Sequence, residues 1–378
     1  MAAFDLAVVG GGPVGASLAR ALRGHAVALI APPPRAGEHS GFDPRVSALS
    51  PGTVDFLRAL GVWQSLPAER LARVEAMRIF GGDPRAVLEF DAYEAGVREL
   101  AWIVEDSALQ RALWSGLSGM ALHCERLEAG AQSAVLSFGD GAPLAAKLVV
   151  GADGAHSFVR RAAGIEARES SFGQVAVVAN FHCGKPHHNV AYQWFQGGPV
   201  LALLPLPGDQ VSMVWSLPES EAARIGAMSG GMLAAEVARA SHGVLGSLAA
   251  ASPARTFALQ RLAARRLVAP RVALVGDAAH VVHPLAGQGL NLGLQDARAL
   301  AAVLLGREPG RDPGDARLLR RYERRRAEPI LAMDATISGL FSLYRARGPM
   351  VERLRNAGLN LTNRMAVLKN VLMRQAMS

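Results

Sequence analysis

The chain has 378 residues, of which 50% are hydrophobic and 19% charged, so it can bury a large core and is not a disordered protein. This length fits two domains. Its two cysteines, Cys124 and Cys183, are far apart in the sequence, which argues against a disulfide framework and for a reducing compartment. The net charge of +8 comes mainly from scattered arginines, so we expect no nucleic-acid partner.

The N-terminal residues favour a cytoplasmic protein. Asp5 stands where a secretory signal needs a basic flank, and three consecutive glycines, residues 10–12, interrupt the apolar run that follows. No window approaches the roughly 20 uninterrupted apolar residues of a spanning helix. We therefore expect any membrane contact to be peripheral, at the inner face of the membrane.

The first 30 residues predict a βαβ unit. Residues 5–9 and 26–30 are typical of buried strands, with a short helix at 16–23 between them. The intervening turn contains Gly10, Gly12 and Gly15, which would supply a tight turn, close approach of the backbone to a pyrophosphate, and helix–strand packing. This pattern predicts a dinucleotide site.

The carboxylate that usually holds the adenosine ribose is missing from this unit. The second strand ends at Ala31 and runs into three prolines. Three explanations stay open: weaker retention of the cofactor, a substitute from Glu38 in the following loop, or a 2′-phosphate bound by Arg35.

The remaining pattern predicts an α/β protein built from two interleaved domains. Short alternating segments within 73–97 and an antiparallel meander between 175 and 217 indicate sheet outside the first domain. We expect a Rossmann-like dinucleotide-binding domain interrupted by a β-rich substrate domain, with a helical C-terminus. The expected boundaries are 1–72, 98–173 and 262–330 for the first domain, 73–97 and 174–261 for the second, and 331–378 for the C-terminal segment.

Residues 276–293 are the most informative stretch. They place Asp277, two histidines and several glycines between an apolar strand at 271–275 and an amphipathic helix that begins near Leu290. The N–H groups at such a helix start suit an anion, either a phosphate or the N1/C2-carbonyl edge of a reduced flavin.

The segment from residue 331 onward has seven basic residues against two acidic ones. This surplus fits either an anionic membrane surface or a solvated helical face.

Three separated motifs resemble those of the FAD-dependent aromatic hydroxylases of the 4-hydroxybenzoate hydroxylase fold. They are the Gly10, Gly12, Gly15 turn, the Gly151-Ala152-Asp153-Gly154 segment with Ser157 and Arg160, and the segment from Gly276 to Gly289. Residues 45–50, 61–63, 198–206 and 283–291 look most like the ubiquinone-biosynthesis hydroxylases within that family.

The resemblance assigns roles to individual residues. It places Gly10, Gly12 and Gly15 at the FAD pyrophosphate, Arg45 and Gln110 near the phosphate and ribityl parts, and Asp277 on a ribityl hydroxyl. Asp153 falls in a motif that serves both FAD and NAD(P)H. The residues expected along the isoalloxazine are Gly287, Gln288, Gly289, Leu290 and Asn291, and the expected reaction-centre residues are His280, His283, Pro284, Gly287 and Gln288. For the two histidines, proton handling and positioning both stay open.

The activity that the resemblance implies is aromatic hydroxylation. NAD(P)H, as a transient co-substrate, would reduce FAD, and O2 would then reach the ring of a prenylated phenol of ubiquinone biosynthesis through a flavin C4a-hydroperoxide. Two alternatives are an FAD-dependent reductase of an isoprenoid lipid and a flavin-poor accessory subunit that binds a lipid quinone.

Other conspicuous residues have ordinary interpretations. The histidine-rich segment 182–188 lacks the paired spacing of a zinc site, so no metal is expected. Asp153 and Asp277 could instead be turn or cap residues. Trp194, Phe195 and Trp215 lie on predicted strands and would face either the core or the substrate. Arg160, Arg161 and residues 324–326 are expected on solvated faces.

Overall fold

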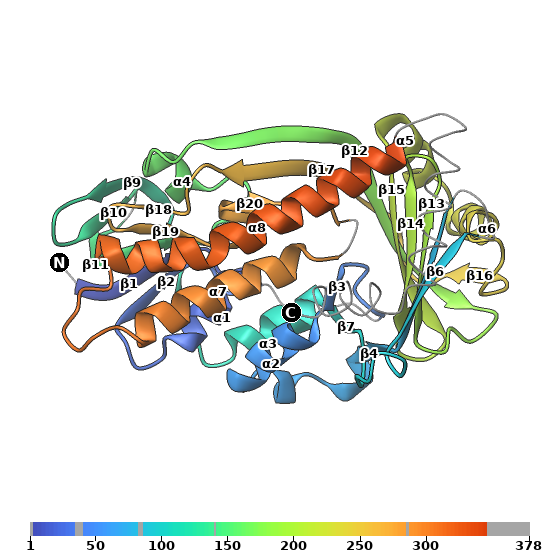
Figure 1. Ribbon diagram of the computed structural model, residues 1–378, viewed down its shortest axis with the longest axis horizontal. Helices are drawn as coiled ribbons and strands as arrows, with labels where there is room; N and C mark the ends of the chain where they lie inside the picture. Colours follow the sequence, from blue (N-terminus) through green and yellow to red (C-terminus); the bar gives the residue numbers. More distant parts are fainter. Residues whose placement is uncertain (1–2, 35–40, 82–85, 140, 285–286, 346–378) are drawn as a thin grey trace.

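The computed structural model describes residues 3–34, 41–81, 86–139, 141–284 and 287–345 (Figure 1). Within them an eight-stranded sheet lies near one end of an elongated molecule and a nine-stranded sheet near the other. This arrangement confirms the predicted α/β class, with a Rossmann-like part and a β-rich part.

The eight-stranded sheet has the order β18-β19-β11-β1-β2-β8. Central strand β1 pairs in parallel with β2 on one side and with β11 on the other, while β10 and β9 extend antiparallel from β11. The strands are β1 (Ala3–Val9), β2 (Val27–Ile30), β8 (Gly119–Met120), β9 (Cys124–Ala129), β10 (Ala134–Phe138), β11 (Leu144–Gly151), β18 (Val268–Ala269) and β19 (Val272–Leu274).

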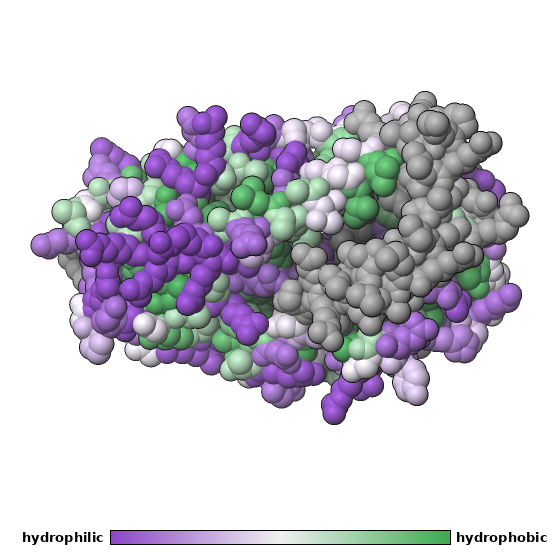
Figure 2. All heavy atoms as spheres, viewed as in Figure 1, coloured by the Kyte–Doolittle hydropathy of each residue, from purple (hydrophilic) through white to green (hydrophobic). Residues whose placement is uncertain are grey.

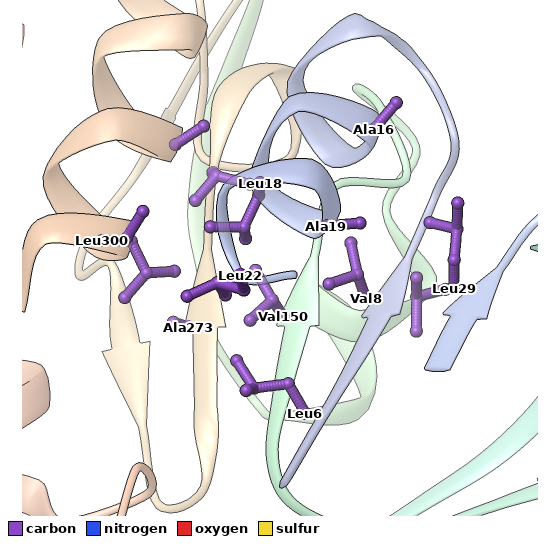
Figure 3. Close-up of a cluster of buried hydrophobic side chains, with 14 of the residues drawn as sticks. Leu6, Val8, Ala16, Leu18, Ala19, Leu22, Leu29, Val150, Ala273 and Leu300 are labelled. Atoms are coloured by element: carbon purple, nitrogen blue, oxygen red, sulfur yellow. The ribbon is translucent and has the colours of Figure 1, made fainter. Parts of the chain in front are cut away.

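Helices cover this sheet and bury its apolar strands. Figure 3 shows Leu18 of one helix, Leu22 directly after that helix and Leu300 of another helix near Val8 and Val150 of the sheet, and all five side chains are buried. Strands covered on both faces are apolar along their length, which explains the uninterrupted hydrophobic runs. The helices of this part are α1 (Pro13–Ala21), α2 (Pro51–Ala59), α3 (Asp106–Trp114), α4 (Phe158–Ala162) and α7 (Gly289–Leu305).

The nine-stranded sheet has the order β20-β17-β12-β15-β14-β13-β5-β6, with β16 paired to β12. It is antiparallel except where β13 runs parallel to β5. Helices α5 (Glu219–Gly226) and α6 (Gly230–Ala240) pack on one of its faces. The strands are β5 (Ala76–Phe80), β6 (Val87–Asp91), β12 (Ala167–Cys183), β13 (Val190–Phe195), β14 (Val200–Leu206), β15 (Gln210–Pro218), β16 (Leu248–Ala250), β17 (Arg255–Ala264) and β20 (His280–Val281).

A small antiparallel sheet, β3-β7-β4, lies between the two larger ones. Its strands are β3 (Val46–Leu49), β4 (Leu71–Val74) and β7 (Ala101–Glu105), and two short 3-10 turns, η1 (Trp63–Ser65) and η2 (Ala68–Arg70), precede β4.

Two long strands connect the two ends of the molecule. β12 and β17 run side by side along its length, so both continue through the predicted domain boundaries at 173/174 and 261/262. Their pairing shifts register between Ser171 and Gln174, where Gly173 has a φ of 66°. This bulge bends the strand at the predicted boundary and redirects the side chains beside it.

Helix α8 (Ala316–Arg345) crosses the molecule from the eight-stranded sheet toward α5 (Figure 1). It continues through residue 331, where the C-terminal segment was predicted to begin. The rest of that segment, 346–378, lies outside the described residues. Among the described helices, none combines the length and apolar character needed to cross a membrane.

Candidate active site

The turn between β1 and α1 leaves open space at one of its three motif glycines. A Cβ on Gly10 would lie 2.2 Å from the Ala152 carbonyl oxygen, and one on Gly15 would lie 2.0 Å from the Gly10 carbonyl oxygen. A Cβ on Gly12 would meet no atom within 4 Å. Gly12 is the N-cap of α1, which has neither a capping side chain nor an acidic residue in its first turn. Unpartnered N–H groups and open space therefore occur together, which fits a pyrophosphate.

Helix α3 supports this turn from behind. Trp114 Nε1 donates to the Gly11 carbonyl oxygen at 2.7 Å, and Gln110 Nε2 donates to the same oxygen at 3.4 Å. Gln110 thus lies beside the glycine turn, and its role near the phosphate and ribityl parts of FAD stays a prediction.

Ala31, at the position of the missing ribose carboxylate, is a packing residue. It is buried, and a Cβ on Gly11 would lie 2.7 Å from the Ala31 Cβ. The alternative partners of the ribose, Arg35 and Glu38, lie outside the described residues.

Asp153 follows β11 and contacts the start of helix α4, whose N-cap is Ser157. Its Oδ1 accepts a hydrogen bond from the Ser157 hydroxyl at 2.5 Å, and its Oδ2 accepts one from the Val159 N–H at 3.1 Å. Asp153 therefore supports the helix start without being its N-cap. A role toward FAD or NAD(P)H stays a prediction.

Arg160 was expected on a solvated face, and this expectation is wrong. Its side chain is 3% exposed; its Nη1 donates to the Ala278 carbonyl oxygen at 2.9 Å and its Nη2 to the Ala155 carbonyl oxygen at 2.8 Å. The acceptors come from separate loops after β11 and β19, so the local sequence could not reveal them. Arg160 ties these two loops together.

Asp277 lies in the 3-10 turn η3 (Gly276–Ala278), directly after β19. Its neighbours in the turn are buried, whereas Asp277 itself is exposed. The protein around its carboxyl still limits solvation and raises its pKa; Asp296 adds to this, while His280 and Arg45 act in the opposite direction. Asp277 therefore presents a carboxyl group to open space that it shares with Arg45.

Arg45, just before β3, is well placed to reach a bound ligand. Its Nε lies 2.7 Å from Asp106 Oδ2, and its side chain is still 67% exposed. Its guanidinium lies 5.8 Å from the ring centroid of Phe257 on β17. Arg45 therefore stands between the Rossmann-like part and the large sheet.

His280 is held inside the protein. It is 4% exposed, and its Nε2 lies 2.6 Å from Oδ2 of the fully buried Asp296. The other Asp296 oxygen accepts from Arg326 Nε at 2.6 Å. This geometry favours positioning over proton handling for His280. It also shows that the solvated face predicted for Arg326 is wrong, because Arg326 pairs with a carboxylate 30 residues away and is 5% exposed.

His283 lies where the two parts meet. It is fully buried, and its Nε2 lies 3.0 Å from Gln174 Oε1, while Gln174 Nε2 donates to the Gly198 carbonyl oxygen at 3.0 Å. The Phe172 and Phe341 rings pack against the imidazole at 4.7 and 5.1 Å between centroids. Burial lowers the pKa of His283 to about 4, so the ring is neutral at pH 7.

The start of α7 has free space beside Gly289, whereas the side chain of Asn291 is buried. A Cβ on Gly289 would meet no atom within 4 Å, and α7 begins with no capping side chain. Asn291 is buried: its Oδ1 accepts from the Ser50 N–H at 2.9 Å and its Nδ2 donates to the Ala48 carbonyl oxygen at 2.8 Å. Asn291 therefore fastens the helix start to the segment around β3.

Three more predicted residues surround this helix start. Gly287, with a φ of 62°, donates its N–H to the Pro284 carbonyl oxygen at 2.9 Å, and Gln288 is the N-cap of α7. Leu290 is half-buried against the core of the first part. The predicted residues of 280–291 thus extend from β20 of the nine-stranded sheet to the start of α7, and their contacts with a flavin stay predictions.

One face of the nine-stranded sheet turns toward the Rossmann-like part. Asn180 Nδ2 on this face donates to the Phe42 carbonyl oxygen at 2.9 Å. The strand register places no charged side chain on this face between residues 174 and 180 of β12 or on their partners in β13, β14 and β15, whereas on the neighbouring strand β17 Arg255 pairs with Val178. Within that part of β12 to β15 the polar members are Gln174, Asn180, Gln193, Ser212 and Ser216, and the remainder are apolar.

The conspicuous aromatic residues mostly pack in cores. Trp194 and Trp215 lie on the opposite face of the sheet, against α5 and α6, and Phe195 joins a cluster with residues of α7 and α8. In the 182–188 segment, His187 Nε2 lies 2.9 Å from the Leu206 carbonyl oxygen. No group of three or more potential metal ligands converges within the part of the chain that the structure describes.

Sequence reasoning missed Gln174, Asp296 and Arg326. Asp296 did leave a signal, because it occupies a buried position of α7 between Leu292 and Leu300, at a spacing of four residues. A carboxylate on the apolar face of a helix needs a buried partner.

Comparisons with known proteins identify the family. A family model described as an FAD binding domain matches residues 3–334. Ubiquinone hydroxylase UbiL of Rhodospirillum rubrum is 34% identical, covering 99% of this chain and 89% of that protein. The 3-demethoxyubiquinol 3-hydroxylase of Escherichia coli is 33% identical, covering 99% and 98%. Among solved structures, PqsL of Pseudomonas aeruginosa, a probable FAD-dependent monooxygenase, has a TM-score of 0.77 at 24% identity, covering 95% of this chain and 100% of that one.

These relatives support the hydroxylase prediction and not the two alternatives, an isoprenoid-lipid reductase and a flavin-poor accessory subunit. The chain belongs to the FAD-dependent aromatic hydroxylases, and within them to the ubiquinone-biosynthesis hydroxylases, and it is an FAD-dependent monooxygenase that uses NAD(P)H as a transient co-substrate.

Proposed function

We propose that this chain hydroxylates an uncharged phenol that carries a prenyl tail, a precursor of ubiquinone. The names of the relatives, which refer to ubiquinone and to demethoxyubiquinol, support a substrate of this kind. The observation that carries the proposal is the uncharged central part of the sheet face, on β12 to β15, that turns toward the Rossmann-like part; the nearest cation in the strand register is Arg255 of β17. A substrate carboxylate would have no cationic partner on the central strands of that face, and an unpaired buried charge is strongly unfavourable.

The residues that would hold FAD lie along the edge formed by the ends of β1, β11 and β19. Gly12 and the start of α1 would take the pyrophosphate, Arg45 and Gln110 the neighbouring phosphate and ribityl oxygens, and Asp277 a ribityl hydroxyl. The start of α7 at Gly289 would face the ring system, where its dipole stabilises negative charge. Bound FAD supplies hydride acceptance and oxygen activation, the steps that side chains cannot perform.

The protein's own contribution near the ring is positioning and exclusion of water. His283 is neutral and fully buried, and it links the loop after β20 through Gln174 to the sheet. The Phe172 and Phe341 rings enclose it. We propose that this cluster closes the junction between the two parts and would keep bulk water away from the oxygen chemistry that bound FAD supplies.

We also propose that helix α8 rests on the inner face of the membrane that contains the substrate. Its first half exposes Arg317, Arg320, Arg324 and Arg325, and its second half exposes large apolar residues, including Leu331. Figure 2 shows hydrophilic surface over the first half of α8 and paler or hydrophobic surface farther along it. The basic half would attract anionic lipid head groups, and the apolar half would insert at the membrane interface.

Substrate charge tests the proposed activity. With NAD(P)H and O2, a 2-polyprenylphenol should be hydroxylated at least about a hundredfold more efficiently than its 4-carboxylate analogue, because an unpaired buried carboxylate costs about 3 kcal/mol or more. Product formation measured by mass spectrometry gives the ratio of kcat/KM values. Equal turnover of both compounds would contradict the proposed substrate class.

Asp277→Ala tests the flavin site. Loss of a charged hydrogen-bond acceptor should weaken FAD binding by roughly tenfold to a hundredfold, measured by fluorescence titration of the apoprotein. Asp55→Ala, which removes an exposed carboxylate from α2, is the matched control and should bind FAD like the wild type. Unchanged affinity in Asp277→Ala would count against this assignment.

His283 should make the protein less stable in mild acid. Its pKa falls from 6.5 to about 4 on folding, so between these values the unfolded chain binds the extra proton and stability decreases as pH decreases. From pH 7 to 5 this effect amounts to about 2 kcal/mol. Urea unfolding measures this effect. From pH 7 to 5 the free energy of unfolding should fall less in His283→Asn than in the wild type, whereas the exposed-site variant His242→Asn should show the wild-type decrease. Parallel pH profiles for all three proteins would refute this account of His283.

Vesicle flotation tests the membrane proposal. The wild type should bind vesicles that contain anionic lipid and not neutral ones. The double variant Arg320→Ala/Arg324→Ala should bind about tenfold or more weakly, since each basic side chain contributes about 1 kcal/mol near such a surface. Arg126→Ala, on the distant strand β9, should bind normally. Binding to neutral vesicles, or no difference between the two variants, would contradict the proposal.

A further inference from the structure

One buried carboxylate connects three segments beneath the predicted flavin edge. Asp296 on α7 has no exposed surface, and its Oδ2 accepts from the Gly276 N–H at 2.9 Å and lies 2.6 Å from His280 Nε2. Its Oδ1 accepts from Arg326 Nε on α8 at 2.6 Å. Both oxygens are therefore engaged, and the contacts come from the loop after β19, from β20 and from α8.

The Asp296 carboxylate is ionised within this network. Burial alone would raise its pKa, but His280, Arg326 and the Gly276 N–H together outweigh burial and lower the pKa below its usual value. Since an ionised carboxylate can only accept, His280 must donate from Nε2. Charge-assisted hydrogen bonds of this kind are short and strong, so the positions of their donors are closely determined.

Gly276 links Asp296 to the predicted flavin site, because its N–H donates to Asp296 and Asp277 follows it directly. Gly276 adopts a φ of 61°, and a Cβ there would lie 3.1 Å from the Val14 Cγ2 on α1, so the backbone passes α1 closely. His280 follows Asp277 three residues later. The two contacts of Asp296 Oδ2 thus bracket Asp277 and hold the backbone that directs its carboxyl group.

Arg326 extends this link to α8. Besides Asp296, it donates from Nη2 to the Leu292 carbonyl oxygen at 3.1 Å and from Nη1 to Gln295 Oε1 at 3.3 Å. Arg326 therefore spans nearly a full turn of α7 while remaining 5% exposed. Farther along α8, the Phe341 ring lies 5.1 Å from His283, at the other end of the same loop.

We propose that Asp296 is the positioning residue of the flavin-binding loop and that Arg326 makes flavin affinity depend on its ion pair with Asp296. The proposal rests on the proposed flavin site at Asp277, which it deepens. If the pair had only a structural role, its removal would lower the stability of the fold and would not specifically weaken FAD binding.

The molecule provides a matched control on the same helix. Asp334 of α8 pairs with Arg261 of β17, with Asp334 Oδ1 2.9 Å from Arg261 Nε. This pair also fastens α8 to the body of the protein, but it touches neither Asp296 nor the loop at 276–283. Asp334→Asn therefore loosens α8 without removing a contact of the loop.

The experiment compares Asp296→Asn, Arg326→Met, Arg326→Lys and Asp334→Asn in the full chain. Fluorescence titration of each apoprotein gives the FAD dissociation constant, urea unfolding gives stability without FAD, and the visible spectrum reports the surroundings of the bound flavin. Asp296→Asn should weaken FAD binding by about tenfold to a hundredfold and shift the flavin bands. Arg326→Met should show a similar loss, Arg326→Lys should recover part of it, and Asp334→Asn should stay within about twofold of wild-type affinity.

A double variant then tests whether the two residues act as one unit. Asp296→Asn/Arg326→Met should bind FAD about as weakly as the more affected single variant. Unchanged FAD affinity in Asp296→Asn, or a loss in Asp334→Asn equal to that in Asp296→Asn, would overturn the proposal. If Asp296→Asn does not fold, Arg326→Met compared with Arg326→Lys decides the question. Failure of the wild type to bind FAD would instead refute the flavin site itself, so the two failures are distinguishable.

Discussion

The site depends on how closely the backbone after β1 approaches the end of β11. Gly10 and Gly15 lie so near to Ala152 and to each other that even one methyl group would not fit. This approach brings the ends of parallel strands and the start of α1 to one edge, while Gly12 keeps open space there. Ligands of open α/β sheets bind outside the carboxyl ends of the strands, so the constraint that builds the fold also forms the edge at which we propose the flavin binds.

The loop after β19 completes this edge through longer-range contacts. Arg160 joins it to the loop after β11, and Asp296 joins it to α7 and α8. These charged groups are buried and paired, so their contribution is to fix geometry rather than to add large net stability. The residues on either side of Asp277 are therefore held in place by buried hydrogen bonds from Arg160 and Asp296.

The sequence predicted the parts of the site that depend on local backbone geometry. The glycine turn, the helix start at Gly289 and the position of Asp277 all follow from short motifs between a strand and a helix. Arg160 and Arg326 were assigned to solvent because each is buried through an acceptor in a distant segment, Ala278 for Arg160 and Asp296 for Arg326. The predicted domain boundaries at 173/174 and 261/262 fall within the continuous strands β12 and β17, whose pairing shifts register between Ser171 and Gln174. Asp296 was detectable in principle as a carboxylate on the apolar face of α7.

The uncharged central strands β12 to β15 of the nine-stranded sheet and the neutral His283 support the proposed neutral substrate. The basic and apolar surfaces of α8 suit the proposed lipid environment. The central claim is that the flavin edge delivers one oxygen atom to a phenolic ring. Its most direct test is incubation of the purified, FAD-loaded chain with NAD(P)H, a prenylated phenol and 18O2, followed by mass spectrometry of the product. The account predicts a hydroxylated ring with one 18O atom from molecular oxygen; consumption of NAD(P)H without labelled product, or a label derived from water, would contradict it.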